Sequence, residues 1–304
     1  MQKSLRVLLN GLIDYAGLFP PAGLEMASAV QHYAAYAAGP QAWALGRFVL
    51  PLTQLAAFEA AWAHLTLPPS AKPWALSALI GPAIADDLAK IAAFNATHHA
   101  TALGIDCVEV KANTSAEIAA IAQARLHAKL HAPVGRPLQI FVEISSVPDP
   151  VDLIAALAEQ RLFAKIRTGG LTQAAFPAPN DVLRFMQCCI EHGVAFKATA
   201  GLHHPLRGDY NLTYEANCAS ATMYGYVNVF LAAAILAQDP HAYAPVAAAL
   251  LLDEDASAFR FSEDGVIWRG NLITHQQLLH LRQHIALSFG ACSFSEPMHE
   301  INQF

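Results

Sequence analysis

Two stretches of the chain place a lysine inside an apolar run that ends in threonine, glycine and a loop. They are LFAKIRTGG, which carries Lys165, and VAFKATAGLHHP, which carries Lys197. An unpaired buried ammonium is costly, so each lysine needs either an ion-pair partner or a lowered pKa. Apolar surroundings and a neighbouring cation can lower a lysine pKa from about 10.4 to about 7–8, which makes the amine a nucleophile for a carbonyl group.

Charged residues on neighbouring runs can join these lysines. Side chains alternate in direction along a strand, so Lys165 shares a face with Arg167, and Lys111 shares one with Glu109. Glu143 lies late in a further apolar run. Two interpretations stay open. The charges form a substrate site, in which Lys111 and Arg167 bind substrate and Glu143 moves a proton, or the glutamates merely pair with the lysines in a polar layer.

The segment GLHHPLRGD follows the Lys197 run directly. Adjacent histidines with an arginine close behind can bind a metal, transfer protons or bind an anion. We expect His203 to act in proton transfer, and His204 and Arg207 to contact substrate, because a loop directly after the Lys197 run lies on the same face. Ordinary loop or core histidines are the competing interpretation.

The N-terminal segment IDYAGLFPPAG places Asp14 in an apolar run before a proline pair. The proline pair favours an extended loop, which predicts a wall of the active site with Asp14 as a ligand or base that reaches substrate. A plug that seals the bottom of the fold is the equal alternative.

Short β-rich runs alternate with alanine-rich stretches of helical period along the chain. Helices are expected in TSAEIAAIAQARLHAKL and DPVDLIAALAEQ, which open with capping residues. SFGACSFSEP is interpreted as a helix end at Gly290 followed by a turn. Strands are predicted at residues 45–52, 74–81, 106–112, 138–145, 162–168 and 194–200, more weakly at 257–262, and as an eighth at 11–17.

Eight strand–helix units favour an α/β fold with one (β/α)8 barrel domain over residues 1–304, and a doubly wound open parallel sheet is the alternative. Catalytic residues of such barrels lie at the C-terminal ends of the strands. Loops 14–23 and 202–226 are therefore expected at the active face, and the length of the second is typical of a functional loop.

The two lysine stretches resemble the paired lysine strands of class I aldolases of the deoxyribose-phosphate aldolase type. Those (β/α)8 barrels carry a K-x-x-T-G strand beside an F-K-x-x-G-G strand, and GIDCVEV is similar to their strand with an acidic residue; the likeness spans about residues 103–202. It implies that Lys165 forms the Schiff base, that Lys197 perturbs it and that Asp106 transfers a proton.

The loops that follow both lysine strands complete this expected site. We place Thr168, Gly169 and Gly201 at the substrate. The chain departs from the family where Ala200-Gly201 replaces a glycine pair, where His-His-Pro replaces a phosphate-binding turn, and where a G-x-S-S strand is missing near the C-terminal end.

The amino-acid composition limits the classes of partner that the protein is expected to bind. A net charge of −6 without a Lys/Arg-rich run argues against nucleic acid and membrane surfaces, so a small-molecule substrate is expected. The 55% apolar content predicts a homo-oligomer, and the longest apolar stretch, at 227–237, is too short for a membrane span and predicts a buried helix. Five cysteines without C-x-x-C spacing and no signal peptide predict a reduced, cytoplasmic protein.

Three functions compete at this point. The first is a Schiff-base-forming carbonyl enzyme of the lyase or aldolase type, acting without a cofactor or metal on a small oxygenated substrate. The second is a metal-dependent hydrolase or isomerase that uses His203, His204, Glu143 and Asp14. The third is an anion-binding or phosphoribosyl-transfer barrel whose cations hold an anionic ligand.

Overall fold

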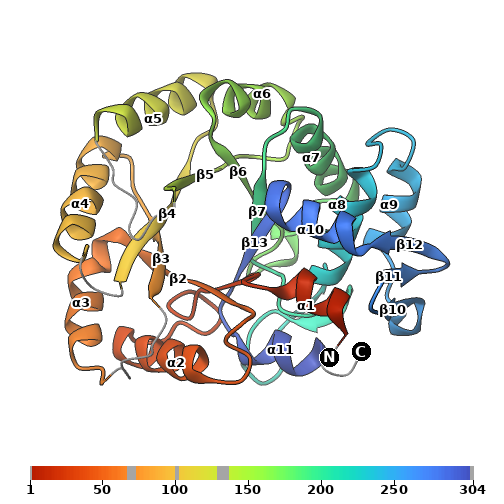
Figure 1. Cartoon of the computed structure of the whole chain (residues 1–304), viewed down its shortest axis with the longest axis horizontal. Helices are drawn as coiled ribbons and strands as arrows, with labels where there is room; N and C mark the ends of the chain where they lie inside the picture. The colour runs from red at the N-terminus through yellow and green to blue at the C-terminus, as the bar shows by residue number, and fades with distance from the viewer. Residues whose placement is uncertain (1, 67–72, 100–102, 129–136, 302–304) are drawn as a thin grey trace.

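The computed structural model describes residues 2–66, 73–99, 103–128 and 137–301. Eight parallel strands close into a barrel in the order β1-β13-β7-β6-β5-β4-β3-β2, and helices surround it (Figure 1). Closure is complete because β1 pairs with both β2 and β13. The predicted (β/α)8 barrel is therefore confirmed, and the open sheet is excluded.

Seven of the eight predicted runs supply strands of this barrel. Their residues are mostly buried, as expected for a parallel sheet that helices cover on the outside. The strands are β1 (Ile13–Tyr15), β2 (Leu45–Pro51), β3 (Trp74–Leu79), β4 (Leu103–Lys111), β5 (Gln139–Glu143), β6 (Phe163–Arg167) and β7 (Phe196–Thr199).

The strand that closes the barrel differs from the prediction. The run at 257–262 contributes β10 (Phe259–Phe261) to a separate antiparallel sheet with β11 (Gly265–Trp268) and β12 (Asn271–Thr274). Closure comes instead from β13 (Ala286–Ala291), in the segment that we expected to be a helix end. Both expectations were wrong, because an apolar pattern identifies an element but not the strands with which it pairs.

The outer layer consists of helices that alternate with the barrel strands. Helix α5 (Ser115–His127) begins as predicted at Thr114, whose hydroxyl accepts a hydrogen bond from the Glu117 N–H in a capping box. Every residue of α8 (Tyr226–Leu236) is buried, which confirms the helix expected from the longest apolar stretch. The others are α2 (Met26–Ala38), α3 (Leu55–Ala63), α4 (Ile84–Thr97), α6 (Val151–Gln160), α7 (Pro179–Glu191), α9 (Ala244–Leu251) and α10 (His275–His284), with short 3-10 turns at Leu52–Gln54, Gln173–Ala175 and Ala256–Ala258.

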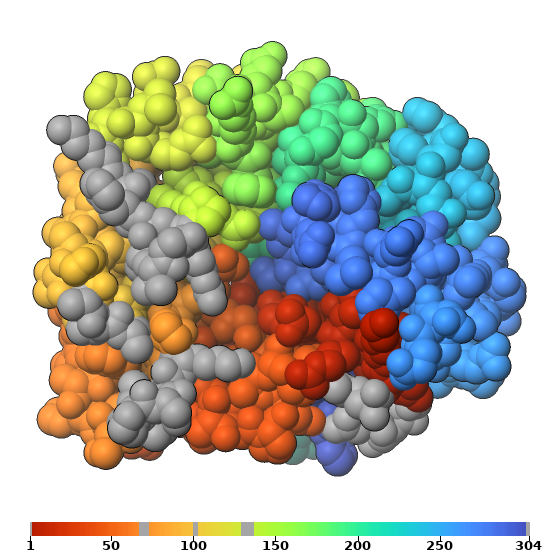
Figure 2. All heavy atoms as spheres, in the orientation of Figure 1, coloured from red at the N-terminus to blue at the C-terminus, as the bar shows by residue number. Residues whose placement is uncertain are grey.

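The first helix packs against elements from the C-terminal third of the chain. Helix α1 (Lys3–Leu9) contacts α10 and the β10–β12 sheet. In the space-filling view the red atoms of the N-terminal segment adjoin the blue atoms of the C-terminal third on this face (Figure 2). Residues near both ends of the sequence are therefore part of one packed structure.

The long segment after β7 is ordered by a hairpin. Strands β8 (Gly208–Asn211) and β9 (Ser220–Met223) pair antiparallel, and Leu212, Ala221 and Met223 form a small apolar cluster beneath them. After β13 the chain forms helix α11 (Ser295–Ile301). Both segments follow barrel strands, so they lie at the C-terminal end of the barrel, where active sites occur in this fold.

Two further observations concern the whole described chain. All five cysteines are free. Among the described residues, no helix has both the length and the apolar character that crossing a bilayer requires.

Candidate active site

Lys165 on β6 and Lys197 on β7 lie directly opposite each other on neighbouring parallel strands, as predicted. Both are buried, with 4% and 1% of their surface exposed. Each ammonium contacts the same carboxylate, because Glu109 on β4 places one oxygen 2.7 Å from Lys165 Nζ and the other 2.7 Å from Lys197 Nζ. Ser77 also donates a 2.6 Å hydrogen bond to Glu109. Glu109 is therefore the centre of the cluster.

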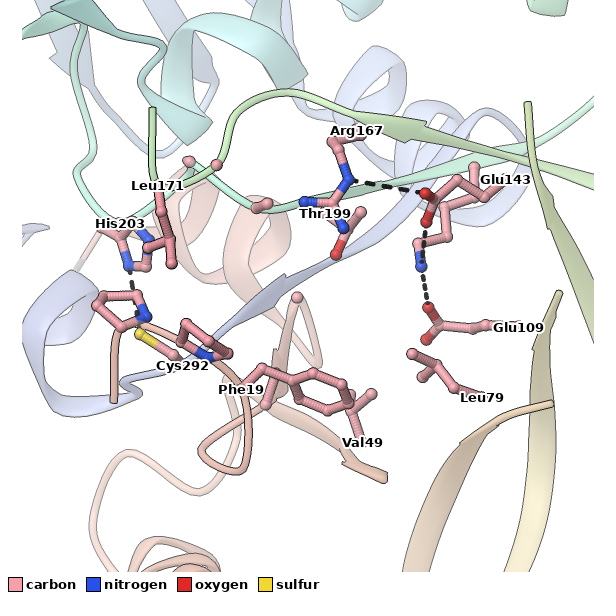
Figure 3. Close-up of a pocket in the computed structure, with 18 of the residues that line it drawn as sticks. Phe19, Val49, Leu79, Glu109, Glu143, Arg167, Leu171, Thr199, His203 and Cys292 are labelled. Atoms are coloured by element: carbon pink, nitrogen blue, oxygen red, sulfur yellow. Dashed lines mark hydrogen bonds and ion pairs between the residues drawn. The ribbon is translucent and has the colours of Figure 1, made fainter. Parts of the chain in front are cut away.

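Lys165 has a second carboxylate partner at the rim. Glu143 on β5 lies 2.8 Å from Lys165 Nζ and also contacts Lys111 at 3.5 Å and Arg167 at 3.6 Å. Burial disfavours the carboxylate of Glu143, but the neighbouring cations, Lys165 above all, hold its pKa below the usual value. Figure 3 shows Glu143 between Arg167 and Glu109, and Lys165 links the two glutamates with contacts of 2.8 Å and 2.7 Å.

Lys197 is held deeper in the barrel. Its Nζ lies 2.7 Å from Asp14 on β1, and Asp14 also accepts hydrogen bonds from the Ser288 hydroxyl and the Arg47 backbone N–H. Burial alone would lower the pKa of Lys197, but Asp14 and Glu109 outweigh it and raise this pKa well above its usual range. These two contacts therefore favour the charged form of Lys197. It also faces the ring of Phe141, 5.6 Å from the ring centre.

The contacts with the two lysines also shift the pKa of Glu109, which they lower. Burial would raise the pKa of Glu109, but Lys165 and Lys197 lower it well below the usual range for glutamate. The surroundings of the two lysines are therefore a layer of ion pairs. Our expectation of apolar walls around Lys165 needs this correction, since carboxylates contact its amine on two sides.

Asp106 does not reach this layer. Its carboxylate pairs with Arg47 at 2.6 Å, and Arg47 also donates to Gln139 at 2.8 Å. The β3–β4 register shifts between the pairs Leu76–Ile105 and Ser77–Cys107, so Asp106 lies in the irregular part of β4, toward the N-terminal end of the barrel. Asp106 does not line the cavity, whereas Glu109, on the same strand, does, so the position that we expected for Asp106 is occupied by Glu109.

A cavity of about 360 Å³ opens above the ion pairs, which is the size of a small-molecule site. Glu109, Glu143, Lys165, Lys111 and Arg167 supply its charged side. Figure 3 shows Phe19, Val49 and Leu79 as its apolar wall, and His203 and Cys292 at the end away from Glu143. Phe19 belongs to the segment before the proline pair, and Pro20 and Pro21 line the same cavity. The N-terminal loop is therefore a wall of the cavity.

His203 lines this cavity, and its Nδ1 lies 3.7 Å from Cys292 Sγ. Burial, together with the neighbouring His204, lowers the pKa of His203 to about 4. Burial also raises the pKa of the Cys292 thiol. The two groups therefore meet as a neutral imidazole and a neutral thiol at neutral pH, which suits hydrogen bonding to substrate more than nucleophilic attack by sulfur.

Three of the residues predicted to bind substrate lie elsewhere. His204 contacts Glu300 at 2.8 Å, outside the cavity lining. Arg207 pairs with Glu254 and is likewise absent from the lining, so of the three loop residues expected there only His203 borders the cavity. Asp14 is completely buried beneath the cavity floor by its contact with Lys197. All three residues come from segments that lie near the cavity. The sequence did not indicate that their side chains point away from it.

The loops after β6 and β7 are locked against each other. The Thr168 hydroxyl donates a 2.6 Å hydrogen bond to the carbonyl of Ala200. A Cβ atom at Gly169 would lie 2.9 Å from Cα of Gly201, and Gly201 has a positive φ of 75°. Thr168 and Gly169 therefore position the loops without lining the cavity, whereas Gly201 lines it directly.

The chain matches no family model, no curated protein and no solved structure. A barrel alone does not define an activity, so the function has to follow from the geometry of the site.

Proposed function

We propose that the protein is an enzyme of the lyase or aldolase type that forms a Schiff base between Lys165 and the carbonyl group of a small oxygenated substrate. The observation that carries this proposal is the position of Lys165. Its side chain lines the cavity, and its Nζ lies within 2.8 Å of two carboxylates, of which Glu143 at the rim can take up its proton. (β/α)8 barrels commonly carry enzyme sites at this end.

Schiff-base formation needs a neutral amine and a group that returns the proton. Glu143 is the better acceptor, because its contacts with Lys111 and Arg167 at the rim can be released to substrate, whereas both oxygens of Glu109 are held by buried lysines. The amine of Lys165 attacks the carbonyl carbon and forms a carbinolamine. Glu143 then returns a proton to the carbinolamine oxygen, which leaves as water and gives the iminium.

Lys197 and Glu109 stabilise the cation that results. The iminium nitrogen replaces the ammonium beside Glu109, so the 2.7 Å contact with this carboxylate supports the new positive charge. Lys197 keeps Glu109 ionised from the other side. The iminium withdraws electrons from the adjacent carbon, and Glu109 or Glu143 can remove a proton there or assist cleavage of a carbon–carbon bond.

The charge of the cluster favours an anionic substrate. Lys111 and Arg167 have side chains that are 73% and 49% exposed, so both can turn toward a ligand at the rim. Together the ion pairs hold four cations and three carboxylates, a net charge of +1: Lys111, Lys165, Arg167 and Lys197 against Asp14, Glu109 and Glu143. A carboxylate or phosphate on the substrate would neutralise this excess.

Hydrogen exchange at the carbon next to a carbonyl tests the proposal. A panel of small aldehydes, ketones and oxo acids is incubated with the protein in D2O, and NMR follows the loss of the proton signal. Lys165→Arg keeps the charge but cannot form an iminium, so it should abolish exchange, whereas Lys90→Arg, on the exposed face of α4, should not change it. Exchange that survives in Lys165→Arg would refute the assignment.

A further inference from the structure

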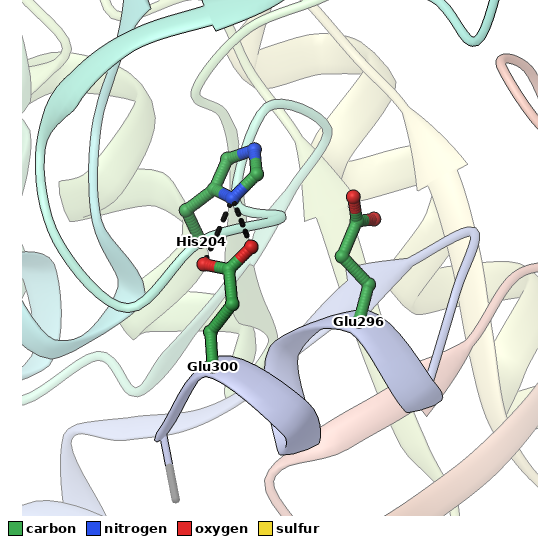
Figure 4. Close-up of side chains that lie close together, drawn as sticks. All are labelled: His204, Glu296 and Glu300. Atoms are coloured by element: carbon green, nitrogen blue, oxygen red, sulfur yellow. Dashed lines mark hydrogen bonds and ion pairs between the residues drawn. The ribbon is translucent and has the colours of Figure 1, made fainter. Parts of the chain in front are cut away.

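A second group of polar side chains lies beside the main cavity and takes no part in the proposed reaction. His204, in the loop after β7, points its Nδ1 at the Glu300 carboxylate, with distances of 2.8 and 3.0 Å to the two oxygens. Glu296 lies one turn earlier on α11, and one ligand atom from each of the three residues lies within 4.8 Å of the others. Figure 4 shows both glutamates rising from one helix toward the imidazole.

In the part of the chain that the structure describes, the carboxylates of Glu296 and Glu300 pair with histidines only. Residues four apart on a helix share a face, so Glu296 and Glu300 are held together by the helix itself. Within the described ranges neither has a lysine or arginine partner. The Tyr214 hydroxyl donates a 3.2 Å hydrogen bond to Glu296. The two carboxylates therefore lie together beside the imidazoles of His203, 4.0 Å from Glu296, and His204, 2.8 Å from Glu300.

We propose that His204, Glu296 and Glu300 form a binding site for a first-row divalent cation, with Zn²⁺ as the preferred ion. One imidazole and two carboxylates are a donor set that suits zinc, whereas Mg²⁺ and Ca²⁺ favour oxygen donors alone. The imidazole is oriented for this role, because its ring stacks on Tyr210 with centres 3.5 Å apart. This donor set is independent of Lys165 and of its carboxylates.

The surroundings leave room for a further ligand on the cation. A cavity of about 390 Å³ lies against the cluster and is lined by His204, Glu296 and Tyr214. It shares His203 and Pro21 with the main cavity. Three protein donors with an open fourth position is the pattern of a zinc site that accepts water or a substrate oxygen. Such a cation would also join α11 to the loop that carries His203.

Calorimetric titration with Zn²⁺ tests this site directly. The full-length protein is treated with chelator, dialysed and titrated with Zn²⁺, and separately with Mg²⁺, at neutral pH. We expect one Zn²⁺ per chain and much weaker binding of Mg²⁺. His204→Asn and Glu300→Gln should each raise the Kd for Zn²⁺ about tenfold or more, since each removes a donor.

The matched control is His241→Asn, which removes an exposed histidine paired with Glu191 at 3.2 Å and should leave the Kd unchanged. Circular dichroism confirms that each variant is folded, and at the same Zn²⁺ concentration the melting temperature should rise more for the native chain than for His204→Asn. Absence of a stoichiometric site, equal Kd values in native and donor variants, or equally tight Mg²⁺ binding would overturn the proposal. None of these outcomes bears on Lys165, which is tested by a different reaction.

Discussion

Glu109→Gln should destabilise the protein by about 3 kcal/mol at neutral pH. Lys165 and Lys197 each contact a different oxygen of Glu109 at 2.7 Å. In glutamine one of these oxygens becomes an NH2 group, which cannot accept from an ammonium, and the other becomes a neutral acceptor, so one contact is lost and the second is weakened. A hydrogen bond to a charged group contributes roughly 1.5–3 kcal/mol, so the gross loss is roughly 3–6 kcal/mol. Lys165 keeps its contact with Glu143, and Lys197 keeps its contact with Asp14. The variant also avoids the cost of burying the charge of Glu109. These two effects bring the net cost to the lower end of that range.

The stability difference between native protein and Glu109→Gln depends on pH, because it requires the ionised carboxylate of Glu109. The pKa of Glu109 is held well below its usual range in the folded protein, so its stabilisation is complete above the unfolded-state value of about 4.3. It is lost as the pH falls from there toward the folded-state pKa, because the unfolded chain then binds a proton that the folded chain does not. The difference between native protein and Glu109→Gln should therefore shrink below about pH 4.

Urea unfolding followed by circular dichroism at pH 7 and at lower pH measures both effects. Glu159→Gln, which changes an exposed glutamate on α6, serves as the control and should unfold with the native protein. A midpoint for Glu109→Gln equal to that of the control at pH 7, or a difference that stays constant as the pH falls, would show that the ion pairs around Glu109 do not stabilise the fold as we describe.

Three further predictions concern the cavity and its loops. His203 should stay neutral from pH 5.5 to 8, since its pKa is lowered to about 4; an NMR titration that finds a value above 6 would contradict its burial. Gly169→Ala should cost roughly 1–3 kcal/mol in thermal unfolding, because its Cβ would overlap the loop at Gly201, and an unchanged stability would disprove the close packing. In the exchange assay, Arg167→Gln should raise KM with little change in kcat, and the reverse result would remove Arg167 from substrate binding.

The sequence contained enough local information to predict the barrel and its lysine pair. Alternation along a strand is a local property, and it placed Lys165 and Lys197 on one face before their register was known. A glycine shortly after each lysine, Gly169 and Gly201, marked the C-terminal end of each strand. The barrel architecture then brought Glu143 from the preceding strand to Lys165, as expected for neighbours in a parallel sheet.

What could not be predicted depended on long-range packing. The irregular pairing at Asp106 breaks the alternation of β4, so the acidic residue that reaches the lysines is Glu109, three positions later. The short strand β13 carries small residues, with Ser288 hydrogen-bonded to Asp14 and Gly290 lining the cavity, and this small-residue pattern resembles a helix end in isolation. Glu300, the partner of His204, lies 96 residues away in the sequence, and no local motif predicts this contact.

The central claim is that Lys165 forms a covalent imine, and reductive trapping tests it most directly. The native protein is incubated with a small aldehyde or ketone that undergoes exchange, reduced with borohydride, digested and mapped by peptide mass spectrometry. We predict one stable adduct, on the peptide that contains Lys165, and none in Lys165→Arg. Adduct formation on Lys197 or Lys111 in place of Lys165, or turnover by the native protein without any trapped adduct, would contradict the account.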